Sequence, residues 1–85
     1  MSESGTNPAD VVMYWRPGCG FCGALARRLS ETSLSVEKRN IWDDVEAAAF
    51  VRGVASGNET VPTVVVKGRA LVNPSVEEIL AALAE

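Results

Sequence analysis

The spacing of apolar residues in the first half of the chain predicts a strand, a helix and a second strand. Residues 11–15 are a continuous apolar run rich in β-prone side chains, which is typical of a buried strand. From Cys19 to about Glu31, apolar residues recur at every fourth position among alanines and arginines, which predicts an amphipathic helix. Over residues 34–41, Leu34, Val36 and Lys38 alternate with the polar residues Ser35, Glu37 and Arg39, an imperfect alternation that indicates a second strand.

The second half of the chain predicts another helix followed by a hairpin. Either aspartate of Asp43-Asp44 can cap a helix that continues to Val54. Residues 61–66 form the most strand-like run of the chain. A tight turn over residues 67–69 then leads into a short strand over residues 70–72, which predicts a β-hairpin.

A last helix is predicted near the end of the chain, in one of two registers. Ser75 and Glu78 have the spacing of a capping box. In the competing register, Asn73 is the cap and Pro74 occupies the first helical position. The apolar face of the helix then comprises Val76, Ile79, Leu80 and Leu83.

The resulting order, β-α-β-α-β-β-α, predicts an α/β fold with one mixed four-stranded sheet flanked by helices. The first two strands should be parallel because a helix connects them, and the closing hairpin should be antiparallel. We expect a single domain over residues 10–85, preceded by a flexible arm over residues 1–9.

Composition and charge exclude several classes of function. The 85-residue chain has a net charge of −3, whereas nucleic-acid binders usually carry a basic excess. No segment approaches the roughly 20 apolar residues that span a bilayer. Two cysteines and no histidine cannot complete a structural zinc site or a Cys–His catalytic pair. Without an apolar leader, we expect a cytoplasmic protein whose cysteines form a reversible disulfide.

The strongest chemical signal is the pair Cys19 and Cys22, placed where a strand passes through a glycine-containing loop into a helix. Cys19 is expected at the helix N-terminus, where free N–H groups favour a thiolate, and Cys22 inside the first turn. A free thiol with a pKa of about 8.5 is only about 3% ionised at pH 7, and Cys-x-x-Cys motifs lower that pKa to roughly 3.5–7.5. We therefore expect Cys19 to attack a disulfide and Cys22 to resolve the product. The alternative interpretation is a pair of core or metal-binding thiols.

The neighbours of the cysteines have two interpretations each. Arg16 either supports the Cys19 thiolate or is a solvated loop charge. Phe21 either lines the substrate surface or begins the core face of the helix. Trp15 either packs in the core or flanks the site. Trp42 either forms one wall of a thiol groove or is a packed aromatic.

Three segments together resemble the glutaredoxin family, and most closely the mycoredoxins, which work with mycothiol. They are Val12-Met13-Tyr14-Trp15 before Cys19-Gly20-Phe21-Cys22, then Thr60-Val61-Pro62-Thr63-Val64, and Val72-Asn73-Pro74-Ser75. The resemblance implies a thioredoxin fold with Cys19 as nucleophile and Cys22 as resolving thiol. It also implies a cis Pro62 beside the cysteines, although only about 5–6% of X–Pro bonds are cis in general. The Thr60-Val61-Pro62 segment would then pair with the cysteine part of a bound thiol, through the backbone of Val61.

One departure from the family pattern concerns the thiol. Glutathione-using glutaredoxins resemble one another in a Gly-Gly pair followed by a residue and an aspartate, where the γ-glutamyl carboxylate is received. This chain has Asn73-Pro74-Ser75-Val76 instead, and Pro74 has no N–H to donate. Mycothiol has no γ-glutamyl group, so the resemblance implies mycothiol as co-substrate, bound beside Asn73, Pro74 and Ser75.

The expected partners are a low-molecular-weight thiol and oxidised or thiolated proteins, with no tightly bound cofactor or metal. We expect a monomer that binds neither nucleic acid nor membrane. Two other functions are open at this point. One is a dithiol hydrogen donor reduced directly by a thioredoxin-reductase-like flavoenzyme. The other is an iron–sulfur carrier, with a cluster held between two subunits by one cysteine from each and two external thiols.

Overall fold

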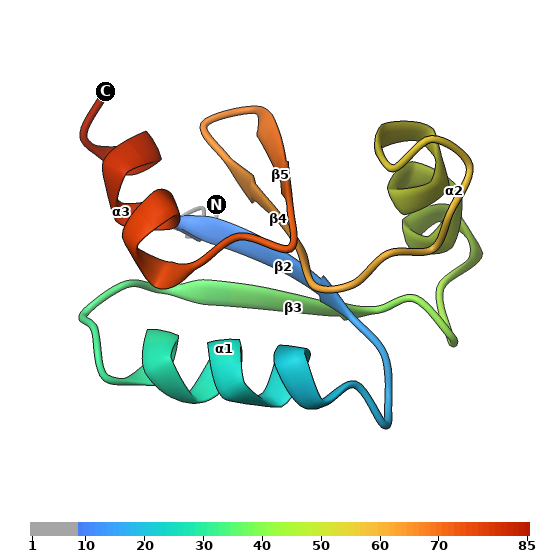
Figure 1. The fold of residues 1–85 in the computed structure, drawn as a ribbon, viewed down its shortest axis with the longest axis horizontal. Coiled ribbons are helices and arrows are strands. Elements are labelled where there is room, and N and C mark those ends of the chain that lie inside the picture. Colours follow the sequence, from blue (N-terminus) through green and yellow to red (C-terminus); the bar gives the residue numbers. More distant parts are fainter. Residues whose placement is uncertain (1–8) are drawn as a thin grey trace, which may run out of the picture.

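A mixed four-stranded sheet with three helices organises residues 9–85, the part of the chain that the computed structural model describes. The elements in chain order are β2 (Val11–Trp15), α1 (Gly20–Ser30), β3 (Val36–Asn40), α2 (Val45–Val54), β4 (Thr63–Val66), β5 (Arg69–Val72) and α3 (Val76–Leu83) (Figure 1). This order is the predicted one. The arm expected over residues 1–9 lies, apart from Ala9, outside the described residues.

The strand order is β3-β2-β4-β5, which makes β2 and β4 the central strands. As predicted, β2 and β3 are parallel, with Met13 opposite Lys38. Strand β4 is antiparallel to both β2 and β5. Lys67 and Gly68 make the two-residue turn of the hairpin, both with positive φ (51° and 79°), the combination that suits a tight turn between twisted strands.

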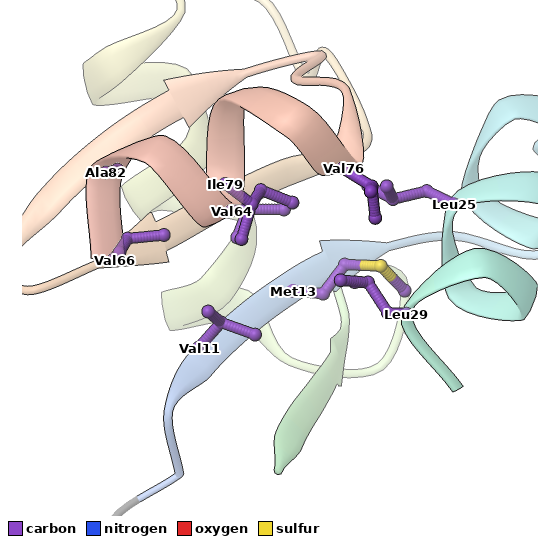
Figure 2. Close-up of a cluster of buried hydrophobic side chains, with 9 residues drawn as sticks. All are labelled: Val11, Met13, Leu25, Leu29, Val64, Val66, Val76, Ile79 and Ala82. Atoms are coloured by element: carbon purple, nitrogen blue, oxygen red, sulfur yellow. The ribbon is translucent and has the colours of Figure 1, made fainter. Parts of the chain in front are cut away.

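The main core lies on the face of the sheet that α1 and α3 cover (Figure 2). Alternate residues of the central strands meet leucines of α1 and the apolar stripe of α3, because strand side chains alternate between faces. The buried cluster consists of Val11, Met13, Leu25, Leu29, Val64, Val66, Val76, Ile79 and Ala82. Helix α2 covers the opposite face with a smaller cluster of Ile41, Ala47, Ala48 and Val51.

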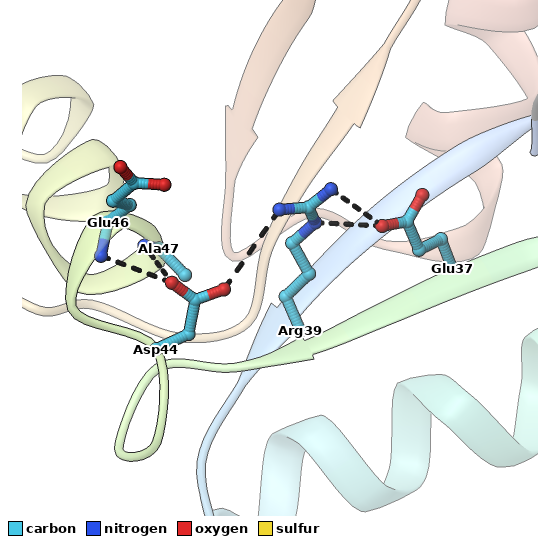
Figure 3. Close-up of polar contacts among 5 residues, drawn as sticks. All are labelled: Glu37, Arg39, Asp44, Glu46 and Ala47. Atoms are coloured by element: carbon cyan, nitrogen blue, oxygen red, sulfur yellow. Dashed lines mark hydrogen bonds and ion pairs between the residues drawn. The ribbon is translucent and has the colours of Figure 1, made fainter.

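The start of α2 is fixed by Asp44, whose side chain accepts hydrogen bonds from the N–H groups of Glu46 and Ala47, both at 3.1 Å. Of the two aspartates that the sequence offered, Asp44 is therefore the cap. Arg39 joins this cap to β3, lying 2.8 Å from Glu37 and 4.0 Å from Asp44 (Figure 3). The hydrogen bond to Glu37 raises the pKa of Arg39. This network holds both ends of the loop that joins β3 to α2.

Two other sequence predictions are decided by hydrogen bonding. Strand β4 begins at Thr63 rather than at Val61, because Pro62 has no N–H to donate to a neighbouring strand. Helix α3 takes the capping-box register, in which Ser75 Oγ accepts from the N–H of Glu78 and Glu78 Oε1 accepts from the N–H of Ser75. The register with Asn73 as cap is wrong.

An ion pair between Arg28 and Glu77, at 2.8 Å, links α1 to α3 on the surface. The hydrogen bond from Arg28 lowers the pKa of Glu77 from its ordinary value of 4.5. A carboxyl whose pKa is depressed by folding contributes stability above its unfolded-state pKa and loses it as the pH falls through the lower folded-state value. We expect Glu77→Gln to lower the melting temperature slightly at pH 7, by an amount that shrinks below about pH 4.5.

Thermal unfolding of the parent protein and of the Glu77→Gln variant between pH 2.5 and 7 measures this effect. In an Arg28→Gln background, most of the pH-dependent difference should disappear because the dominant partner of Glu77 is gone. A Glu77→Gln difference that stays constant down to pH 2.5 would contradict the prediction.

Candidate active site

The loop after β2 places Cys19 at the N-terminus of α1. Gly18 has a φ of +80°, a backbone conformation that residues with a Cβ rarely adopt, and this turn leads the chain into the helix. Cys19 is the N-cap of α1, and its Sγ accepts a hydrogen bond of 3.1 Å from the N–H of Cys22. A sulfur that accepts a backbone hydrogen bond at the positive end of a helix is favoured as a thiolate.

Cys19 and Cys22 are joined by a disulfide, with their Cα atoms 5.2 Å apart. Cys22 is only 3% exposed and lies on the buried face of α1, whereas Cys19 is partly exposed. Phe21 is 74% exposed, so the interpretation of Phe21 as part of the core face is wrong. In the first turn the buried position belongs to Cys22, which lies one residue and about 100° further around the helix than Phe21.

The Thr60-Val61-Pro62 segment lies against the exposed sulfur. The Val61–Pro62 peptide bond is cis, as the resemblance implied, and Pro62 is buried. The carbonyl oxygen of Val61 is 3.8 Å from Cys19 Sγ. Thr63 Oγ1 donates to the carbonyl of Thr60 at 2.8 Å, which ties the segment to the start of β4. Within residues 9–85, the N–H of Val61 donates no backbone hydrogen bond.

The Asn73-Pro74-Ser75 segment is brought next to Pro62. The N–H of Asn73 donates to the carbonyl of Pro62 at 2.7 Å, and Asn73 adopts a positive φ of 53°. Pro74 is buried, and Ser75 uses its N–H and its hydroxyl in the capping box. Of the three residues, exposed Asn73 has polar side-chain atoms that are still open to a ligand. Thiol contacts of Pro74 and Ser75 stay predictions.

Arg16 and Trp42 lie together and form what we call the Arg16–Trp42 wall, in which Arg16 borders the same cavity as Cys19 and Cys22. The guanidinium carbon of Arg16 is 5.7 Å from the centre of the Trp42 ring, a cation–π arrangement, and Trp42 is 63% exposed. The interpretation of Trp42 as a packed aromatic is therefore wrong. Its position two residues after the end of β3 was the available signal, because a residue at that end of a parallel strand lies on the same edge of the sheet as the end of β2.

Comparisons with known proteins agree with this geometry. The glutaredoxin family profile matches residues 11–71. The chain belongs to the glutaredoxin family. Its relatives include two proteins of Mycobacterium tuberculosis that carry the name glutaredoxin, from strains CDC 1551 / Oshkosh and H37Rv. Each is 37% identical over 76 residues, which is 88% of this chain and 90% of the relative.

Solved structures show the same fold. The thioredoxin-like protein BC3987 superposes with a TM-score of 0.74 and 20% identity, over 86% of this glutaredoxin and 99% of that chain. The holo form of glutaredoxin C1 from Populus tremula x tremuloides gives a TM-score of 0.64 and 20% identity, over 86% of this chain and 72% of the other. The α/β fold is thus a thioredoxin-like one.

Family and geometry together define the activity. This glutaredoxin is a thiol–disulfide oxidoreductase, with a cysteine pair at the end of its N-terminal strand β2. None of the helices in residues 9–85 has the length and the apolar character needed to cross a bilayer.

Proposed function

We propose that this glutaredoxin reduces mixed disulfides in the cytoplasm with mycothiol as its electron donor. Cys19 is the nucleophile, Cys22 the resolving thiol, and the surface formed by Val61, Asn73 and the Arg16–Trp42 wall receives the small thiol. Its substrates are oxidised or thiolated proteins, and it works as a monomer.

The first turn of α3 is the observation that carries the choice of thiol. A helix N-terminus usually offers free N–H groups to an anion. Here Pro74 has no N–H, and the N–H of Ser75 already donates to the carboxylate of Glu78 at 2.7 Å. Glu77 adds a second carboxylate to the same turn. A γ-glutamyl carboxylate would meet like charges and few open donors, and mycothiol has no such group.

The edge at Val61 supports recognition of the cysteine part of the thiol. Its carbonyl is beside Cys19 Sγ, and its N–H donates to no backbone group of residues 9–85. An extended thiol can pair with these two groups as a short added strand does, which places its sulfur at Cys19. Such main-chain pairing fixes the position of the thiol but does not depend on the other groups that the thiol carries. The residues around Val61, including the first turn of α3, must therefore discriminate between thiols.

The Cys19 thiolate attacks the mycothiol sulfur of a protein–mycothiol disulfide, forms a Cys19–mycothiol disulfide, and releases the protein thiolate, which takes up a proton. The Cys22 thiolate then attacks Cys19 Sγ of this intermediate, releases mycothiol as its thiolate and forms the Cys19–Cys22 disulfide. Two mycothiol molecules reduce that disulfide and leave as oxidised mycothiol, so two electrons pass from them to the protein disulfide. In a protein without Cys22, a second mycothiol thiolate instead attacks the mycothiol sulfur on Cys19 and releases the Cys19 thiolate and oxidised mycothiol.

A comparison of electron donors tests the proposal. The purified protein and one protein–mycothiol disulfide substrate are supplied in turn with mycothiol, with glutathione, and with NADPH plus a thioredoxin-reductase-like flavoenzyme in the absence of any small thiol. We expect turnover with mycothiol at least about tenfold faster than with glutathione, the loss that follows when a charged group finds no partner and meets like charge. Equal or faster turnover with glutathione would contradict the choice of thiol. Turnover that needs only the flavoenzyme would replace it with the dithiol hydrogen-donor function.

A further inference from the structure

A cavity of about 240 Å³ lies beside the disulfide, between α1 and the strands β2 and β3. Its apolar floor is formed by Met13, Trp15 and Ala26, and Arg16 and Lys38 are the charged residues that border it. Both cysteines line it, and Cys22 lines it although only 3% of that residue is exposed. The cavity is therefore an open space that reaches the buried Cys22.

Lys38 borders this cavity because of its position on β3. The register places it opposite Met13, and Met13 faces α1. A second cavity of about 170 Å³ shares Ala26 of α1 and Lys38 of β3 with the first, so the two cavities adjoin at these residues. Glu37 and Arg39, its neighbours on β3, point to the opposite face, where they pair with each other (Figure 3).

The charges around the cavity have one sign. No aspartate or glutamate borders it, and no carboxylate of residues 9–85 lies within ion-pair distance of Lys38 or Arg16. Arg16 is held over Trp42 on the side of Cys19, whereas Lys38 comes from the strand beneath α1. The cavity thus has no side chain that can accept a proton from Cys22, but it has a cation that favours the thiolate.

We propose that Lys38 is a positioning residue for the resolving step, favouring the thiolate of Cys22 across this cavity. In that step the Cys22 thiol gives its proton to water in the cavity. Its thiolate attacks Cys19 Sγ of a mixed disulfide, and the Cys19–Cys22 disulfide forms. The departing thiolate takes up a proton, so the substrate gains the two electrons that the cysteine pair loses. This inference rests on the exchange chemistry of the proposed function, but not on which thiol is the donor.

The pKa of Cys22 is the direct readout. In a Cys19→Ser background, Cys22 is the one remaining thiol, and its titration is followed by thiolate absorbance in the ultraviolet. Lys38 is exposed, and a solvated cation at the border of a cavity that reaches a thiol lowers the pKa of that thiol by about half a unit to one unit. We expect Lys38→Met to raise the pKa of Cys22 by that amount, Lys38→Arg to leave it close to the parent value, and Lys38→Gln to match Lys38→Met.

The resolving rate is the second readout, measured in the protein with both cysteines after rapid formation of a mixed disulfide on Cys19. A rise of half a unit to one unit in the pKa of Cys22 lowers the fraction of Cys22 that is thiolate at pH 7 by about three- to tenfold. The remaining thiolate is more nucleophilic, so the net expectation for Lys38→Met is an about two- to fourfold slower release of the small thiol. The matched control is Arg27→Met, which removes an exposed cation of α1 that does not border the cavity.

The outcomes separate this inference from the function. An unchanged Cys22 pKa and resolving rate in both Lys38→Met and Lys38→Gln would overturn it, whatever the donor. Equal effects of Arg27→Met would also overturn it, because general charge would then explain the result. A raised pKa that Lys38→Arg restores supports it, and this holds even if mycothiol fails as donor, because the titration involves no small thiol.

Discussion

Replacement of Cys19 by serine is expected to reduce disulfide reduction to the rate of the uncatalysed exchange. Cys19 is the partly exposed member of the pair, it caps α1, and it is the sulfur that lies 3.8 Å from the Val61 carbonyl. A serine hydroxyl in this position does not ionise near neutral pH and cannot form the mixed disulfide. The measurement is NADPH oxidation in an assay coupled to regeneration of the small thiol, with a small-thiol mixed disulfide as substrate.

Cys22→Ser is the matched control, because it makes the same chemical change three residues along the same helix. Cys22 is buried, and in the proposed mechanism it acts only after the mixed disulfide has formed, so this variant should retain activity on small-thiol mixed disulfides. It should no longer form the intramolecular disulfide. The intact mass after oxidation shows this, because the parent protein loses two hydrogens and the variant does not. Full activity of Cys19→Ser would contradict the assignment of the nucleophile, and complete inactivity of Cys22→Ser would show that the intramolecular disulfide is obligatory.

The sequence predicted the parts of this site that depend on local backbone chemistry. A cysteine directly before a helical pattern predicts an N-cap sulfur, and its partner three residues on predicts a shared side of the first turn. Pro62 limits where β4 can begin, since a residue without an N–H cannot take a full place in a strand. The order of strands and helices followed from the change of hydrophobic period along the chain.

Side chains whose surroundings come from distant parts of the chain were not predictable in the same way. Trp42 is apolar and follows a strand, which is typical of packing, but it is exposed and lies under Arg16 from another loop. Phe21 fits the fourfold spacing of Leu25 and Leu29, but the buried residue of the first turn is Cys22. Lys38 looks like an ordinary edge-strand charge until the register of β2 and β3 places it at the cavity under Cys22.

The position of the proposed thiol-binding surface also depends on the core beneath α3. The segment before this helix is held at the site by the hydrogen bond from Asn73 to Pro62, and the helix is held to the sheet by its buried face. Ile79 is fully buried and packs in the cluster with Val64 and Val66 of β4 (Figure 2). Loss of that packing therefore acts on the fold and on the Asn73 side of the site together.

Ile79→Ala is expected to destabilise the protein by about 2–5 kcal/mol, because it removes buried methyl and methylene groups from a position that the surrounding sheet and helices cannot close over completely. For a domain of this size, about 4–8 °C of melting temperature is lost per kcal/mol, so the midpoint should fall by about 10 °C or more. Thermal unfolding followed by far-ultraviolet circular dichroism measures the midpoint, and urea titration measures the free energy.

Leu80→Ala provides the control on the next residue of the same helix. Leu80 is 43% exposed, and alanine is at least as good a helix former as leucine, so this variant should lose less than about 1 kcal/mol. The contrast matters because both changes shorten an apolar side chain in α3, and only one of them opens space in the core. Equal losses for the two variants would mean that α3 is held mainly by its capping box and its ion pair to Arg28. In that case the Asn73 segment would be positioned from the Ser75 end of the helix rather than from the sheet beneath it.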